Sequence, residues 1–120
     1  MGKFETFEDI EAWQEAKALA VSIYSVSNVG EFSKDYSFKD QLRRSAVSIS
    51  SNIAEGFERQ GDKEFSRFLY IAKGSCGELR SQLYIAKELK YLTEDEFKEF
   101  SNRTLKISKM ISGLIKYLNK

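Results

Sequence analysis

Two carboxylates near the middle of the sequence have the spacing to do acid–base chemistry or to hold a metal ion. Glu55 and Glu78 each stand in a stretch of small and polar residues at helical spacing. Paired carboxylates on facing helices serve as a general acid and base, or as ligands of a di-metal centre. Such a centre also needs Glu-x-x-His motifs, and the 120 residues contain no histidine. We therefore expect no catalytic residue, no metal site and no cofactor.

The same two stretches favour a hydrogen-bond network between two helices. Polar residues stand at or beside the apolar seams at five positions: Asn52, Glu55, Ser75, Glu78 and Gln82. Buried polar side chains that satisfy one another fix the register of the helices that carry them. The serines and glycines around them are mediocre to poor helix formers, so they also predict a close approach of one helix to the other. We expect a structural network here.

Other signs of enzyme chemistry are missing. Cys76 is the single cysteine and falls on an apolar stripe, which is typical of a small buried side chain without a base beside it. One cysteine excludes an internal disulfide and a Cys-x-x-Cys site. The stretch 74–77 lacks the Lys-Ser/Thr of a phosphate loop. We expect no enzyme activity and no small-molecule substrate.

Charge is sorted along the chain although the formal net charge is only +1. Residues 1–32 carry two basic and six acidic residues, whereas residues 33–91 carry eleven basic and eight acidic ones. Beyond Glu99 the sequence has only basic charges. The candidate nucleic-acid contacts are basic residues in the middle of the chain: Arg43, Arg44, Arg59, Lys63 and Arg67. They would act by phosphate attraction and would be multiplied in an oligomer, and a solvated face is the plain alternative.

Apolar residues recur at helical spacing through nearly the whole chain and predict four helices. The expected limits of the first three are Thr6 to Gly30, Ser37 to Gly61 and Asp62 to about Leu89, with Thr6, Ser37 and Asp62 as caps.

The fourth helix has the clearest start signal. Thr93 and Glu96 form a capping box, and Leu92 and Phe97 occupy the two positions of a hydrophobic staple. A heptad seam then continues to Leu118. Four long helices with short connections predict an all-α fold, an antiparallel up-down four-helix bundle in a single domain over residues 1–120.

Two of the expected helices carry more apolar residues than one seam needs. The additional residues are Phe68, Ile71, Ile85 and Leu89, followed by Leu105, Met110, Ile115 and Tyr117. The extra width indicates either a thicker core or a face buried against another subunit, and we expect a homo-oligomer.

The sequence shows no sign of a membrane. Its apolar runs are far shorter than the roughly 18 residues of a spanning helix. The acidic start is unlike a signal peptide. We expect a cytoplasmic protein.

Several motifs also resemble the bacterial four-helix-bundle family named for the 23S rRNA intervening sequence. These motifs are Phe-Glu-Asp-Ile-Glu-Ala-Trp-Gln at 7–14, Gln-Leu-Arg-Arg-Ser-Ala-Val-Ser-Ile at 41–49, Ser-Asn-Ile-Ala-Glu-Gly at 51–56 and Glu-Phe-Ser-Arg-Phe-Leu at 64–69. Gly74-Ser75 and the run from Glu78 to Leu83 follow in the same order. The resemblance covers nearly the whole chain.

The resemblance implies a four-helix bundle that assembles into a ring, typically a homopentamer, with no known catalytic residues. In a related branch, the accessory variability proteins of diversity-generating retroelements, the protein works with a reverse transcriptase and binds nucleic acid through a basic surface. That branch would match Arg43 and Arg44. Two hypotheses follow. The first is a homo-oligomeric bundle that contacts RNA, DNA or a nucleic-acid enzyme, and the alternative is a scaffold for protein partners without nucleic-acid binding.

Overall fold

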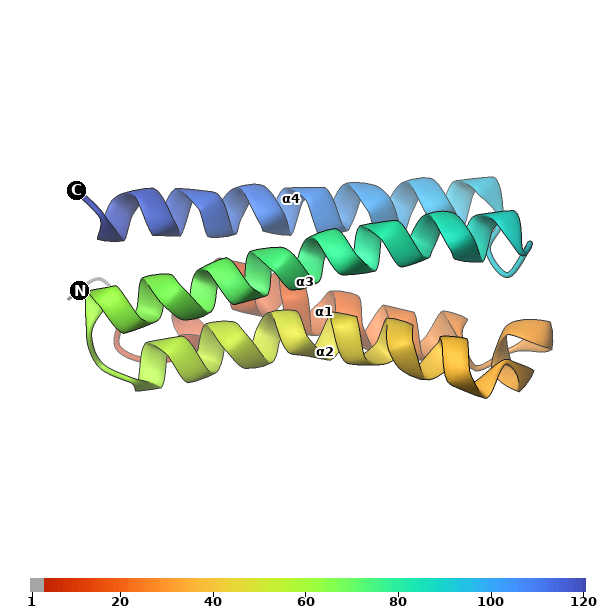
Figure 1. Cartoon of the computed structure of the whole chain (residues 1–120), viewed down its shortest axis with the longest axis horizontal. Coiled ribbons are helices and arrows are strands. Elements are labelled where there is room, and N and C mark those ends of the chain that lie inside the picture. Colours follow the sequence, from red (N-terminus) through yellow and green to blue (C-terminus); the bar gives the residue numbers. More distant parts are fainter. Residues whose placement is uncertain (1–3) are drawn as a thin grey trace.

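The structure of the chain, a computed structural model, describes residues 4–120. Four α-helices follow one another: α1 (Glu11–Val26), α2 (Tyr36–Glu58), α3 (Asp62–Glu88) and α4 (Glu94–Leu118). Two 3-10 helices, η1 (Phe7–Asp9) and η2 (Gly30–Lys34), precede α1 and α2. The described residues contain no strand. Successive helices run in opposite directions (Figure 1), so the predicted all-α bundle is confirmed.

The four helices close around one core. Each helix contacts the next along the chain, and α1 also contacts α4, with the most extensive contact between α2 and α3. Leu19, Ile49, Leu79 and Ile107, one from each helix, are at most 1% exposed. The body measures 46 × 20 × 19 Å. Among the helices of residues 4–120, none is long and apolar enough to cross a membrane.

The start of the first helix differs from the prediction. Thr6 begins only the short η1, where the Asp9 carboxylate accepts hydrogen bonds from the backbone N–H groups of Glu5 and Thr6. Ile10 then adopts an extended backbone (φ −81°, ψ 118°) that inserts its side chain into the core. The long helix therefore starts at Glu11, because the burial of Ile10 interrupts the helical turn.

The caps of α2 and α3 were also predicted at the wrong residues. Asp35, not Ser37, caps α2, because its Oδ1 accepts a hydrogen bond of 3.3 Å from the N–H of Phe38. Helix α2 ends at Glu58, and Gln60 takes the left-handed conformation (φ 57°) that ends it. Gly61 is extended and precedes α3, whose first residue is Asp62.

The turn between α3 and α4 follows the prediction closely. Thr93 Oγ1 accepts from the N–H of Glu96, and the Glu96 carboxylate accepts from the N–H of Thr93, which completes the capping box. Tyr91 in this turn stacks on Phe32 of η2, with 4.9 Å between ring centroids. Its hydroxyl donates a hydrogen bond of 2.8 Å to Asp35, so this residue joins the two connections at one end of the bundle.

The glycines of α3 do not face a neighbouring helix, in contrast to the expectation. A Cβ at Gly74 or Gly77 would meet no atom within 4 Å, since both glycines lie on the outer side of α3. The close approach of α2 to α3 occurs at Gly56, which ends the predicted stretch of small residues in α2, and a Cβ there would lie 2.5 Å from the Cβ of Phe68.

Candidate functional site

A polar groove runs along the outer side of the α2–α3 contact. It encloses about 420 Å³. All of its lining residues are polar: Gln41, Arg44, Ser45 and Ser48 from α2, with Glu78 and Gln82 from α3. Three of these residues were singled out in the sequence for different reasons, Arg44 as a phosphate contact and Glu78 and Gln82 as network members. The fold brings them to one place.

Part of the expected network is formed beside this groove. Asn52 Nδ2 donates to the backbone oxygen of Ser48 at 2.8 Å and to its hydroxyl at 2.9 Å. The hydroxyl of Ser48 in turn shares a hydrogen bond of 2.9 Å with that of Ser75, across the two helices. Asn52 and Ser75 are therefore joined through Ser48, which is not one of the five predicted network positions.

The remaining polar groups of the groove are left without partners among residues 4–120. Gln82 is only 7% exposed, and its buried side-chain oxygen accepts no hydrogen bond from the described residues. Arg44 and Glu78 are exposed, and neither forms an ion pair within the described part of the chain. A buried oxygen without a donor is costly, and either a water molecule in the groove or a group of another chain would satisfy it.

Apolar side chains lie on both sides of this groove along α3. Ile71, Glu78 and Ile85 are spaced seven residues apart and therefore share one stripe of the helix, and Leu89 continues it. All three apolar members are exposed, Ile85 at 48%. The α2–α3 face thus combines exposed apolar residues with unsatisfied polar groups.

A second cluster of sequence candidates lies at the α2–α3 turn, away from the groove. Arg59 pairs with Glu55 at 3.2 Å and with Glu64 at 3.7 Å, and Arg67 pairs with Glu64 at 3.1 Å. The hydrogen bond from Arg67 lowers the pKa of Glu64. Glu55 therefore lies outside the Ser48 network, and its charge is opposed by an arginine.

The ring of Phe68 holds both arginines of this cluster. Arg59 and Arg67 stand 5.0 and 4.9 Å from its centroid. Lys63 at the start of α3 is exposed and forms no ion pair within the described residues. About 15 residues of α2, or roughly 22 Å, separate Arg44 from Arg59, so the five basic candidates do not form one patch.

Arg43 has an intramolecular role. Its Nε donates to the Ser27 hydroxyl at 2.9 Å, its Nη2 donates to the Tyr24 carbonyl at 3.2 Å, and its guanidinium stacks 4.4 Å from the Tyr24 ring. These groups belong to the last turns of α1 and the residue after it. Arg43 therefore ties the end of α1 to α2 and satisfies a carbonyl that the helix leaves open.

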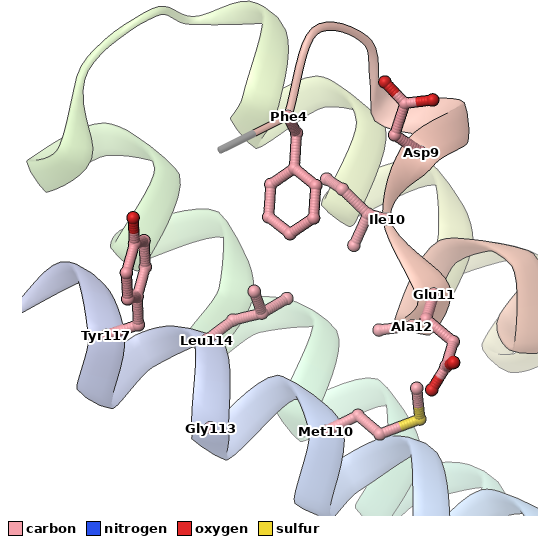
Figure 2. A pocket seen from close by; sticks show the side chains of 9 residues that line it. All are labelled: Phe4, Asp9, Ile10, Glu11, Ala12, Met110, Gly113, Leu114 and Tyr117. Carbon is pink, nitrogen blue, oxygen red and sulfur yellow. The ribbon is translucent and has the colours of Figure 1, made fainter. Parts of the chain in front are cut away.

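A separate pocket of about 370 Å³ lies between the start of α1 and the last turns of α4 (Figure 2). Phe4, Ile10, Met110, Leu114 and Tyr117 give it an apolar lining. The Asp9 carboxylate at its edge points away in Figure 2 and is already used by backbone N–H groups. Glu11 is the other carboxylate of the lining, and its side chain extends toward Met110 in Figure 2.

Cys76 is fully buried, and burial raises the pKa of its thiol to about 12. A thiol with such a pKa stays protonated at neutral pH and is a poor nucleophile. Within the described residues, no group of three His, Cys, Asp or Glu side chains is placed to hold a metal ion.

Comparisons with known proteins identify a matching family model and a solved structure with a similar fold. The model of the family described as "23S rRNA-intervening sequence protein" matches residues 8–113. A crystal structure of a protein of unknown function from the S23 ribosomal protein family of Bacteroides thetaiotaomicron VPI-5482 superposes with a TM-score of 0.81. The two chains are 24% identical, and the match covers 88% of this chain and 95% of the other. No curated protein matches.

Proposed function

Because the chain belongs to the family of 23S rRNA-intervening sequence proteins, and because its α2–α3 face is incomplete by itself, we propose that it is a non-enzymatic bundle that works as a homo-oligomer. The bundle then acts as a subunit that presents surfaces to a macromolecular partner. The resemblance noted in the sequence favours a ring of five subunits.

The observation that carries this proposal is the stripe of exposed apolar residues on α3 beside the polar groove that holds the buried oxygen of Gln82. A second copy would bury Ile71, Ile85 and Leu89, which are 43–48% exposed, so that covering the rest of each side chain contributes roughly half of the 1.5–3 kcal/mol of complete burial. It would also supply a donor for the Gln82 oxygen and opposite charges for Arg44 and Glu78. Charge-assisted hydrogen bonds of this kind specify orientation in an interface.

The residues support a non-enzymatic role. Glu55 and Glu78, the two carboxylates considered for acid–base chemistry, do not share a site, since Glu55 pairs with Arg59 and Glu78 lines the groove. The buried Cys76 lacks a base beside it that would make it reactive.

Light scattering coupled to size exclusion tests the oligomer. We expect a mass that is a multiple of 13.8 kDa, five times larger for a pentamer. Ile85→Lys should reduce this mass toward that of one chain, because it places a charge in the subunit contact. Val21→Lys, on the outer side of α1, changes an apolar residue that is more exposed than Ile85 (61% against 48%) and should leave the mass unchanged. A monomeric wild-type protein at micromolar concentration contradicts the proposal.

A second candidate function is contact with RNA, DNA or a reverse transcriptase through a basic surface. Lys63 favours this nucleic-acid contact, because its side chain is exposed and forms no ion pair within the described chain. Arg43, Arg59 and Arg67, in contrast, bind other groups of the same chain. The basic surface must therefore include residues other than those arginines.

A further inference from the structure

The register between α3 and α4 is fixed by contacts near both ends of the pair. Lys87 Nζ lies 3.3 Å from the Glu94 carboxylate at one end. At the other end, Asn119 Nδ2 donates to the Ser66 hydroxyl at 3.4 Å. Counting in opposite directions from these contacts places Lys73 of α3 level with Lys109 of α4.

The same counting brings basic residues of the two helices into paired rows. Arg67 lies level with Lys116, and Lys63 lies level with the end of α4. This end of α4 and the start of α3 are neighbours in Figure 1. Lys63, Lys73, Lys109 and Lys116 thus lie along one side of the α3–α4 pair, whereas the guanidinium of Arg67 turns toward Phe68 and Glu64.

The side chains of these rows lie beside the α3–α4 seam. On α3, Ser66, Lys73 and Tyr84 share one stripe at intervals of seven and eleven residues, and Tyr84 contacts Phe97 of α4. On α4, Lys109 and Lys116 are seven residues apart. All these lysines are exposed, and none forms an ion pair within residues 4–120.

Carboxylates flank this face at one end only, where Asp62 and Glu64 stand on either side of Lys63. Helix α3 has no acidic residue between Glu64 and Glu78, and the chain has none after Glu99. Of the two acids beside Lys63, Asp62 is the first residue of α3 and Glu64 is paired with Arg59 and Arg67. The four lysines Lys63, Lys73, Lys109 and Lys116 therefore form a surface, here called the α3–α4 lysine face, in which Lys63 lies beside two carboxylates and the other three lysines have no acidic neighbour along their helices.

An aromatic ring stands within the lysine face. Tyr70 lies one turn from both Ser66 and Lys73 on α3 and is 58% exposed. Its ring has no ring partner within the described residues. An exposed ring among cations is the arrangement by which proteins hold single strands, because the ring stacks on an unpaired base while the cations hold phosphates.

We propose that the α3–α4 lysine face binds single-stranded nucleic acid, with Tyr70 stacking on a base and the four lysines contacting phosphates. The proposal rests on the second candidate function and names its surface and its partner. A duplex is a poorer fit, since its bases stack on one another and leave no face for Tyr70. The face lies on the α4 side of α3, so an interface on the α2–α3 face would leave it open.

Fluorescence anisotropy with a labelled single-stranded RNA of about 15 nucleotides tests this proposal on the full chain. Each neutralised phosphate contributes about −0.7 to the slope of log K against log salt, so four contacts predict a slope of about −2.8. Lys109→Gln or Lys116→Gln should make the slope shallower by about 0.7. Tyr70→Ala should weaken binding by roughly tenfold without changing the slope. Lys17→Gln, an exposed lysine on α1, should change neither quantity.

The possible outcomes distinguish an error in the proposed surface from an error in the proposed nucleic-acid binding. If the wild-type protein binds and the lysine and Tyr70 variants bind equally well, the surface is wrong and the candidate function stands. If the wild-type protein binds no nucleic acid at low salt, both fail. A hairpin duplex that binds more tightly than the single strand overturns the choice of partner. The mass from light scattering and the circular dichroism spectrum of each variant should match those of the wild type. This control distinguishes unfolding of a variant from loss of a contact to nucleic acid.

Discussion

Gly56 of α2 lies directly against Phe68 of α3, and a Cβ at Gly56 would be only 2.5 Å from the Cβ of Phe68. The missing side chain is therefore what lets the two helices meet. The Phe68 ring in turn holds the guanidinium groups of Arg59 and Arg67. One glycine thus supports both the helix contact and the arrangement of the ion pairs at the α2–α3 turn.

Gly56→Ala should destabilise the protein. Overpacking of this kind costs about 1–3 kcal/mol, which exceeds the gain of about 1 kcal/mol that alanine brings to a helix. We expect a lower melting temperature by circular dichroism and a lower urea midpoint. Gly74→Ala is the matched control, because its Cβ would meet no atom within 4 Å, and it should stabilise the bundle by up to about 1 kcal/mol. Equal effects of the two substitutions would contradict this account.

The sequence pattern was sufficient for the fold but not for the role of these glycines. Heptad periodicity and the Thr93 capping box are local signals, and both are found in the structure. Which side of a helix a glycine faces depends on how that helix is rotated in the bundle. Gly74 and Gly77 share the outer side of α3, whereas Gly56 faces inward, a difference visible from the position of each relative to the apolar stripe.

Tyr91→Phe should lower the free energy of unfolding near neutral pH. In strong alkali the difference between the variant and the wild type should disappear. The hydrogen bond to Asp35 raises the pKa of Tyr91 above its ordinary value of 10.0. Since the folded pKa is the higher one, the contribution is fully present below pH 10 and is lost as pH rises through the folded pKa. Melting curves of wild type and variant from pH 7 to 11 should converge at the alkaline end. A constant difference would show that the lost packing, not the hydrogen bond, is responsible.

Cys76 should report global unfolding. Burial raises its thiol pKa from 9.0 to about 12, so the folded protein holds the thiol protonated and out of reach of solvent. A thiol reagent such as dithionitrobenzoate should react at pH 8 only as fast as the protein opens, and rapidly in denaturant. The same shift makes the folded state less stable as pH rises above 9, because the unfolded chain releases the proton more easily. Fast reaction of the native protein would contradict the burial.

The candidate site depended on tertiary contacts that no sequence pattern contains. Arg43 and Arg44 are adjacent and chemically identical, yet Arg43 is bound to the end of α1 while Arg44 faces the groove. Adjacent helical residues point about 100° apart, so one of two neighbours commonly serves the structure and the other remains free. The sequence carried a signal for Ser48 as well, since it stands one helical turn before Asn52.

The Ser48–Ser75 hydrogen bond should couple α2 to α3 energetically. Ser48→Ala and Ser75→Ala each remove one hydroxyl of a pair that is 2.9 Å apart and partly buried. Each single change should cost about 0.5–1.5 kcal/mol, and the double variant should cost less than the two together, because the Ser48–Ser75 bond can be lost only once. The bond from Asn52 to the Ser48 hydroxyl is lost with Ser48→Ala in either background and cancels in the comparison. Urea denaturation of all four proteins measures this coupling. Ser50, whose hydroxyl bonds only the backbone of its own helix, supplies the control, and Ser50→Ala should add independently to Ser75→Ala. Strict additivity of Ser48→Ala and Ser75→Ala would show that the hydroxyls do not join the two helices.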